Sequence, residues 1–227
     1  MIRRASASAT RHGRWRNGNR TRHIAAMQDT RFEQQIRFIV EIDKLKNVLR
    51  RTLLTDGTRR ENSAEHSWHL ALMAVLLVEH ADPGVDVRRV IEMLLVHDIV
   101  EIDAGDTFAY DVAANADRAA RERAAADRLF SLLPPDQQHA LRALWEEFEA
   151  GQTAESRYAL ALDRLQPLLQ NVFAQGGAWR SHGVTREQIL VRMQPVGDLS
   201  AELGAYVVRM IDEVWAAGYI RSIDDVR

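Results

Sequence analysis

The chain has 227 residues, of which 46% are hydrophobic and 27% charged, a composition typical of one medium-sized globular domain. It contains no cysteine, which excludes disulfide bonds and thiolate chemistry and fits a reducing compartment. The longest uninterrupted apolar run, residues 70–78, is far too short to span a membrane. We therefore expect a cytoplasmic protein without membrane contacts.

The first 26 residues differ from the rest, because they hold seven arginines and no acidic residue. Removing these seven positive charges from the net charge of −2 leaves −9, which argues against binding of the folded part to a nucleic-acid polymer. We expect residues 1–29 to form a disordered basic tail. A natural start at Met27, a transit peptide and a functional basic arm are alternative interpretations of this segment.

Apolar residues recur at three- and four-residue spacing along most of the chain, which predicts helices. A first helix is expected over 32–50, and Asn62 with Glu65 forms a capping box that opens a second, which runs to about residue 80. Further helices are expected over 85–102, 116–133, 136–150, 154–175, 185–193 and 199–218. No segment alternates with period two, so we predict no sheet and a single all-α helical bundle over residues 30–227.

The most informative stretch is 94–106, where His97 and Asp98 lie side by side in an apolar helical run. Glu101 follows one helical turn beyond His97, and Asp106 comes shortly after it. Burying such groups is costly unless they are paired or bind a metal. The dyad therefore predicts polar partners elsewhere in the chain.

His66 and Asp163 are candidate partners, because each lies in an apolar helical stripe of its own. Pro167 lacks the N–H that would bond the carbonyl of Asp163, so we expect a kink that turns this carboxylate toward a shared site. Simpler interpretations are an ordinary buried histidine at 66, a local ion pair at 97–98, and pairing of Asp163 with Arg164 or Arg128.

Two imidazoles and two carboxylates would form a mixed ligand set that suits one divalent transition metal better than Ca²⁺. Four protein ligands leave open positions in a five- or six-coordinate site, which favours Mn²⁺, Co²⁺ or Fe²⁺, with Zn²⁺, Ni²⁺ and Mg²⁺ as alternatives. Such a metal lowers the pKa of a bound water to about 7, and Glu101 and Asp106 could handle its proton. Five basic side chains could bind a phosphate group or, alternatively, form a solvated rim. They are Lys46, Arg50, Arg51, Arg59 and Arg60.

Four blocks of this sequence resemble the HD-domain metal-dependent phosphohydrolases, and most closely the bacterial 5′-deoxynucleotidase branch and its eukaryotic relative, HD domain-containing protein 2. The blocks are 61–67, 95–106, 144–149 and 160–171, and they occur in this order within residues 32–175. The resemblance implies an HD-type helical domain with the metal site in its core. It also suggests a homodimer.

The resemblance further implies a role for each candidate residue. The substrate-binding arginine of the family, fifteen residues before the first ligand histidine, corresponds to Arg51; Thr52 then stands where nucleotidases often have tryptophan. Glu101 is implied as general acid/base, and Asp106 as the residue that contacts the attacking water. The implied activity is phosphate release from (deoxy)nucleoside 5′-monophosphates by a metal-activated water. The implied metal ligands are His66, His97, Asp98 and Asp163.

Two other functions fit the same residues. One is an HD-type phosphodiesterase or nucleotide pyrophosphohydrolase, although two-metal phosphodiesterases need further histidines, which residues 116–133 lack. The other is a helical binding or regulatory module with a structural metal. Glu101 and Asp106 argue against this second alternative, because a purely structural site has no need of them.

Overall fold

The structure, a computed structural model, describes residues 29–226, so the predicted basic tail lies almost wholly outside the described residues. The longer helices are α1 (Arg31–Ile42), α2 (Ser63–Leu76), α3 (Val87–Val96), α6 (Arg118–Phe130), α7 (Pro135–Ala150), α8 (Ala154–Phe173), α10 (Arg186–Leu199) and α11 (Ala201–Ala216). Short helices are α4 (Glu101–Ala104), α5 (Val112–Asn115) and α9 (Gly177–His182), and 3₁₀ turns are η1 (Asp43–Asn47), η2 (Val78–His80) and η3 (Ile223–Val226). The predicted all-α fold class is confirmed.

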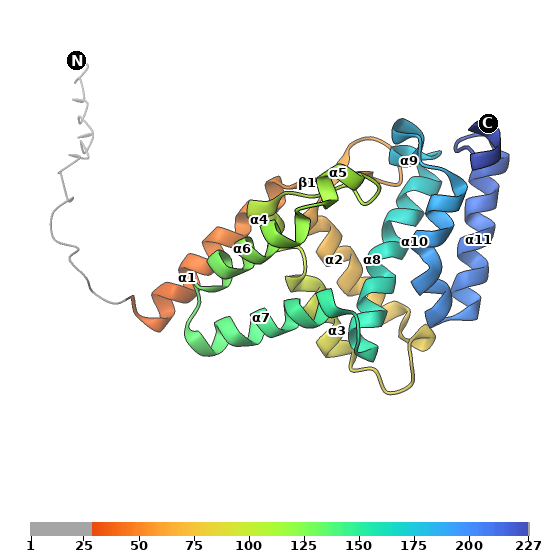
Figure 1. Cartoon of the computed structure of the whole chain (residues 1–227). Helices are drawn as coiled ribbons and strands as arrows, with labels where there is room; N and C mark the ends of the chain where they lie inside the picture. Colours follow the sequence, from red (N-terminus) through yellow and green to blue (C-terminus); the bar gives the residue numbers. More distant parts are fainter. Residues whose placement is uncertain (1–28, 227) are drawn as a thin grey trace, which may run out of the picture.

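Helix α8 lies in the middle of the molecule and packs against α2, α3, α7 and α10 (Figure 1). Helices α1 and α6 lie at one end, and α11 lies at the other, packed on α10. Gly197 and Gly204 face each other where α10 meets α11, and a Cβ at Gly204 would come within 2.9 Å of the Gly197 Cα. The two glycines therefore allow a close approach of these helices. Within residues 29–226, no helix is long and apolar enough to cross a membrane.

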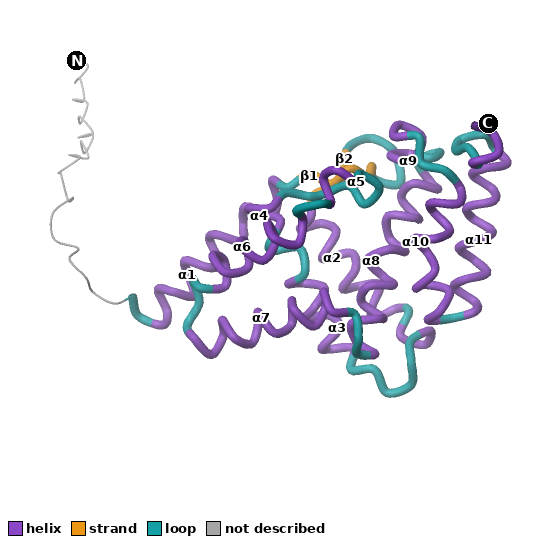
Figure 2. The backbone as a smooth tube through the Cα atoms, viewed as in Figure 1, coloured by secondary structure: helices purple, strands orange, loops and turns teal. Residues whose placement is uncertain are grey.

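A small antiparallel sheet is the main departure from the expected all-helical chain (Figure 2). Strand β1 (Leu49–Leu53) pairs with β2 (Arg60–Asn62), so the predicted helix over 32–50 is wrong beyond Ile42. Side chains alternate along β1, and therefore Thr52 is buried and Arg50 half-buried, whereas Arg51 is exposed. The three β1 residues that are buried or half-buried are Arg50, Thr52 and Leu53, which do not form an apolar alternation, so the sequence carried no such signal for a strand.

Several predicted helix boundaries agree with the structure, and others differ from it. The capping box is confirmed, because the Asn62 side chain accepts from the Glu65 backbone N–H at 3.0 Å and the Glu65 carboxylate accepts in return from the Asn62 N–H at 3.4 Å. The predicted helix over 85–102 is interrupted by a turn at 97–100. Helix α10 continues through Pro195 rather than ending before it. The carbonyl left unbonded there belongs to Val191, which is 74% exposed, so water can satisfy it.

The core consists of two clusters of buried apolar side chains that meet at the dyad. The larger joins α2, α3, α8, α10 and α11, and it includes Leu94. The smaller lies between α1, α6 and α7, and it includes Val96, Ile99 and Val100. The turn that carries His97 and Asp98 is thereby held by apolar packing on both sides, as the position of the dyad in an apolar run led us to expect.

Candidate active site

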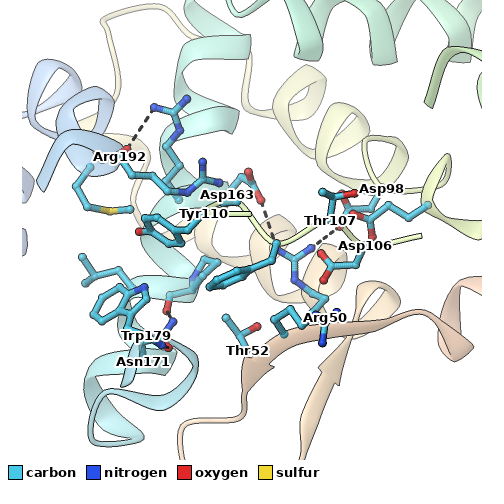
Figure 3. Close-up of a pocket in the computed structure, with 18 of the residues that line it drawn as sticks. Arg50, Thr52, Asp98, Asp106, Thr107, Tyr110, Asp163, Asn171, Trp179 and Arg192 are labelled. Carbon is cyan, nitrogen blue, oxygen red and sulfur yellow. Dashed lines mark hydrogen bonds and ion pairs between the residues drawn. The ribbon is translucent and has the colours of Figure 1, made fainter. Parts of the chain in front are cut away.

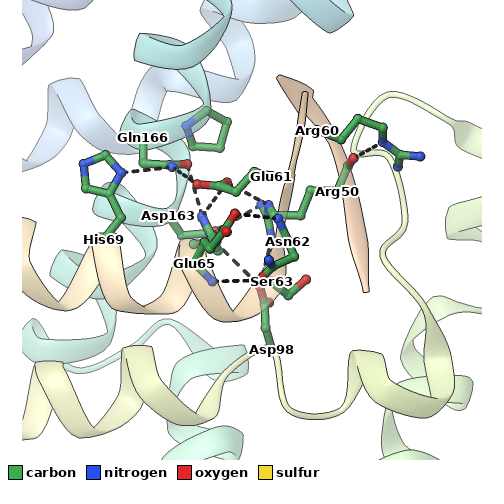
Figure 4. A network of polar contacts seen from close by, with 12 residues as sticks. Arg50, Arg60, Glu61, Asn62, Ser63, Glu65, His69, Asp98, Asp163 and Gln166 are labelled. Carbon is green, nitrogen blue, oxygen red and sulfur yellow. Dashed lines mark hydrogen bonds and ion pairs between the residues drawn. The ribbon is translucent and has the colours of Figure 1, made fainter. Parts of the chain in front are cut away.

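The predicted site residues come from separate elements that converge beside α8. Arg50 is supplied by β1 and Asp163 by α8 (Figures 3 and 4). His66 is supplied by α2, and the dyad by the turn after α3. Nitrogen and oxygen atoms of His66, His97 and Asp98 all lie within 4.8 Å of one another, and these three residues are buried. Asp163 is outside that group but contacts both rings, because its Oδ1 lies 3.0 Å from His66 Nε2 and 3.8 Å from His97 Nε2.

The tautomer of His97 is set by the backbone. Its Nδ1 lies 2.8 Å from the carbonyl oxygen of Leu94, which can only accept, so Nδ1 donates its hydrogen there. Burial lowers the pKa of His97, so the ring is neutral and Nε2 carries a lone pair. That nitrogen is buried, has no hydrogen-bond partner within the described residues and lies 3.0 Å from Oδ1 of Asp98.

The tautomer of His66 follows from a chain of two buried side chains (Figure 4). Glu61 accepts a hydrogen bond of 2.7 Å from Nε2 of Gln166, so the amide oxygen of Gln166 faces His66 Nδ1 at 3.1 Å. An oxygen cannot donate, and therefore Nδ1 of His66 carries the hydrogen. Burial, with the charge of Arg50, lowers the pKa of His66 to about 3, so its Nε2 is an unprotonated acceptor.

With these tautomers, hydrogen-bond acceptors of the histidines face hydrogen-bond acceptors of the carboxylates. The lone pair of His66 Nε2 lies 3.0 Å from a carboxylate oxygen of Asp163, an arrangement that is repulsive without a cation between them. Donor atoms about 2.1 Å from an ion and at right angles to each other lie about 3.0 Å apart, which matches this pair and the His97–Asp98 pair. The residues present therefore fit a divalent cation.

Arg50 provides the positive charge that the site already contains. Its Nη1 lies 2.8 Å from Oδ2 of Asp98, and its Nη2 lies 4.0 Å from Asp163. Burial raises the pKa of Asp98 to about 8 in spite of this contact. One guanidinium therefore does not neutralise the two carboxylates, and a divalent cation would lower the cost of keeping both ionised.

Glu101 and Asp106 line the same pocket, as the resemblance implies for groups that handle a water. Glu101 is buried, and its Oε2 accepts a hydrogen bond of 2.6 Å from the hydroxyl of Ser63. Burial and the neighbouring Asp98 raise the pKa of Glu101 to about 8. A carboxyl group with a pKa near neutral can both take and give a proton at physiological pH, which is what general acid/base catalysis requires.

The structure places the basic side chains around the site differently from the sequence-based expectation. Arg51 lines the pocket, but its exposed side chain makes no ion pair with any residue that the structure describes, whereas Arg50 makes the contacts to the ligand cluster. Arg59 is paired with Glu65 at 2.8 Å, and Arg60 donates to backbone carbonyls of β1. The substrate-binding role of Arg51 therefore stays a prediction, and Arg50 joins it as a candidate.

Arg50 was one of several cations in the sequence, but the specific importance of Glu61, Ser63 and Gln166 was not predicted. Glu61 and Ser63 lie in the same block as His66, so their position close to a ligand was a usable signal. Gln166 lies three residues after Asp163, which places both on neighbouring positions of the same helix face.

The pocket extends from the ligand cluster to a second wall formed by Tyr110, Trp179 and Arg192 (Figure 3). Five arginines and four carboxylates line it, so the bound cation would make its net charge clearly positive. The arginines are Arg50, Arg51, Arg118, Arg164 and Arg192, and the carboxylates are Asp98, Glu101, Asp106 and Asp163. Such a pocket suits a small anionic ligand.

Several known proteins are similar to this chain in sequence or in structure. A solved structure from Magnetospirillum magnetotacticum, described as a predicted metal-dependent phosphohydrolase, is 56% identical, with a TM-score of 0.77 over 84% of this chain and 98% of that one. The 5′-deoxynucleotidase HDDC2 of Bos taurus is 29% identical over 65% of this chain and 71% of its own length. The HDDC2 of Xenopus laevis is 31% identical over 60% of this chain and 66% of its own.

Two further comparisons concern the fold and the family. A conserved hypothetical protein from Pyrococcus furiosus, 22% identical with a TM-score of 0.54 over 80% of this chain and 99% of that one, shares the fold alone. The family described as HD domain matches residues 42–202, which is most of the chain and includes every candidate site residue. The chain therefore belongs to the HD domain family of metal-dependent phosphohydrolases.

Proposed function

We propose that this protein is a metal-dependent phosphatase that releases phosphate from nucleoside 5′-monophosphates, including the deoxy forms. The observation that carries the proposal is the convergence of two imidazole lone pairs and two carboxylates beside the buried carboxyl group of Glu101. The names of the HDDC2 relatives support the substrate class. The net positive pocket supports a phosphorylated ligand.

In this proposal, His66, His97, Asp98 and Asp163 hold one divalent ion, with Mn²⁺, Co²⁺ or Fe²⁺ favoured over Zn²⁺, Ni²⁺ and Mg²⁺. When bound, the ion supplies Lewis acidity toward a phosphoryl oxygen and lowers the pKa of water. The backbone and Gln166 hold the two imidazoles in the tautomer that presents Nε2 to the site.

The remaining residues handle the proton and the phosphate. Glu101 accepts the proton of the attacking water while Ser63 holds the carboxylate in place, and Asp106 orients that water. Arg50 and Arg51 contact the phosphate oxygens as charge develops on them. The new bond joins the water oxygen to phosphorus, the bond from phosphorus to the 5′-oxygen breaks, and Glu101 returns the proton it accepted to that oxygen, so the nucleoside leaves as the alcohol.

The experiment is a phosphate-release assay on the purified chain loaded with Mn²⁺ or Co²⁺. Nucleoside and deoxynucleoside 5′-monophosphates are compared with a bis-phosphodiester and with a nucleoside triphosphate. Turnover of the monophosphates supports the proposal, whereas preferential turnover of the diester or the triphosphate supports the phosphodiesterase or pyrophosphohydrolase alternative. No turnover of any substrate, with the metal verified as bound, would contradict the proposal.

We also propose a homodimer and keep the cytoplasm as the proposed location. An apolar stripe on α2 lacks a partner within the described residues, because Trp68 is 64% and Leu76 65% exposed and Leu72 and Val75 lie between them. Stripes of this kind mark interaction surfaces. Size-exclusion chromatography with light scattering should give twice the mass of 25.8 kDa, and Trp68→Lys should shift it toward one chain. A monomeric wild-type protein would contradict the dimer.

A further inference from the structure

The C-terminal helices supply the part of the pocket that the proposed reaction does not use. Trp179 from α9 and Arg192 from α10 form a wall opposite Arg50 and Asp98 (Figure 3). Tyr110 lies between them and lines the same pocket. These helices therefore contribute side chains to the ligand site as well as to the core.

Two arginines near this wall are half-buried and yet unpaired. Arg50 is paired with Asp98 and Arg118 with Glu122, and Arg51 is exposed to solvent, but Arg164 and Arg192 make no ion pair within residues 29–226. Both are half-buried, and Nη1 of Arg164 donates to the backbone carbonyl of Arg192 at 3.4 Å. This bond places the guanidinium group of Arg164 on α8 beside the backbone of Arg192 on α10.

Neither guanidinium group is neutralised by a carboxylate at ion-pair distance within the described part of the chain, although both line the same pocket. Glu149 and Asp198 border a hollow on the outer side of Arg164, but neither comes within ion-pair distance of it. An anion bound between Arg164 and Arg192 would supply the charge partner that both lack.

The phosphate that reacts has its own cations. It lies at the ligand cluster, where Arg50 and the bound ion are available, and Asp163 is on the same helix as Arg164 but one residue earlier. Successive residues of a helix point about 100° apart, so the two side chains serve different parts of the pocket.

We propose that Arg164 and Arg192 form a second anion subsite, and that the preferred substrate carries a second phosphate group in addition to the 5′-phosphate that is removed. This inference rests on the proposed function for the identity of the reacting group. The second phosphate is either on the sugar, as in a nucleoside 3′,5′-bisphosphate, or joined to the first, as in a 5′-diphosphate. The subsite recognises the group and takes no part in bond breaking.

The test separates recognition from catalysis by measuring binding without turnover. Calorimetric titrations use the full chain with Glu101→Gln, loaded with Mn²⁺, and three probes: 2′-deoxyadenosine 5′-monophosphate, its 5′-diphosphate and its 3′,5′-bisphosphate. One of the two doubly phosphorylated probes should bind about tenfold or more tightly than the monophosphate. The probe that binds more tightly shows where the second phosphate is attached.

Substitutions then test whether the gain in affinity comes from the subsite. Arg192→Gln should weaken binding of the favoured probe about ten- to hundredfold and that of the monophosphate less than threefold. Arg164→Gln should have the same selective effect, and Arg192→Lys should restore part of the affinity. Arg180→Gln is the matched control, because Arg180 is exposed on α9 and its guanidinium group lies over the ring of Tyr219. Melting temperatures verify that each variant is folded.

Two results would overturn the inference. One is equal affinity of the wild-type site for all three probes. The other is an equal loss for the monophosphate and the favoured probe in Arg192→Gln, which would mean that this arginine binds the reacting phosphate. Neither result depends on turnover, so a failure of the proposed function would be seen separately in the phosphate-release assay.

Discussion

Replacing Gln166 by leucine should weaken metal binding without touching a metal ligand. The amide of Gln166 is fully buried and connects the Glu61 carboxylate, at 2.7 Å, to Nδ1 of His66, at 3.1 Å. In the variant, Nδ1 loses this acceptor, and Oε2 of Glu61 lies 3.6 Å away, beyond hydrogen-bond distance. The hydrogen can then move to Nε2, where Oδ1 of Asp163 lies 3.0 Å away and can accept it. We expect the metal affinity to fall about 10- to 100-fold, as is usual when the partner of a metal-binding histidine is lost. This corresponds to about 1.4–2.8 kcal/mol.

The assay is a titration with Mn²⁺ or Co²⁺ in competition with a chelator of known affinity. The ¹⁵N chemical shifts of the His66 ring, recorded without metal, report the tautomer directly. Gln194→Leu is the matched control, because Gln194 is exposed on α10 and remote from His66. A metal affinity within twofold of wild type, together with an unchanged Nδ1–H tautomer, would refute the reasoning.

Glu61→Gln tests the same chain of hydrogen bonds from its other end. A carboxylate only accepts, so it obliges Gln166 to present its oxygen to the ring. A glutamine at position 61 can donate as well, which allows the Gln166 amide to turn over and to present its nitrogen to Nδ1. The Nε2–H tautomer of His66 should then appear in the ¹⁵N spectrum, and metal affinity should fall although every ligand is intact.

Three further predictions concern proton, charge and catalysis. Burial raises the pKa of the Asp98 carboxyl group to about 8, and the metal must displace the proton of that group. Metal affinity should therefore rise about tenfold per pH unit up to pH 8 and then level off. A metal affinity that does not change between pH 6.5 and 8 would contradict the raised pKa. Glu101→Gln should lower kcat by about 10²–10⁴-fold with metal content unchanged, and loss of the metal instead would give Glu101 a structural role. Arg50→Gln should destabilise the metal-free protein by about 3–5 kcal/mol in urea titrations above pH 8, where Asp98 is ionised and loses its buried partner, whereas Arg51→Gln should change stability by less than about 0.5 kcal/mol; equal effects would mean that Asp98 is not held by Arg50.

The sequence predicted those parts of the site that residue type and apolar context encode. His97 and Asp98 were identified because charged groups stood in an apolar run, and the structure buries both against His66. The capping box at Asn62 fixed the start of α2, and with it the turn on which His66 lies. Local hydrogen bonds of this kind depend on residues three apart, so they can be read without knowing the fold.

The parts that were missed depend on pairing across the chain. Arg50 and Arg51 are neighbours of the same type, and only the register of β1 with β2 decides which of them faces Asp98. The role of Gln166 likewise depends on Glu61, which is 105 residues away. Periodicity contains no information about such contacts, because they are set by how separate elements pack.

The interruption at the dyad explains why a continuous helix over 85–102 would not have made this site. In an unbroken α-helix, the carbonyl of Leu94 would accept the backbone N–H of Asp98. Here α3 ends at Val96, the His97 N–H bonds to Met93, and the next backbone bond joins Ile99 to Val96. The carbonyl of Leu94 is therefore left for Nδ1 of His97, which fixes the hydrogen on that nitrogen and turns Nε2 toward Asp98 and Asp163. The end of the helix thus produces the tautomer that metal binding requires, and a substitution that extended α3 through Asp98 would remove it without changing any ligand.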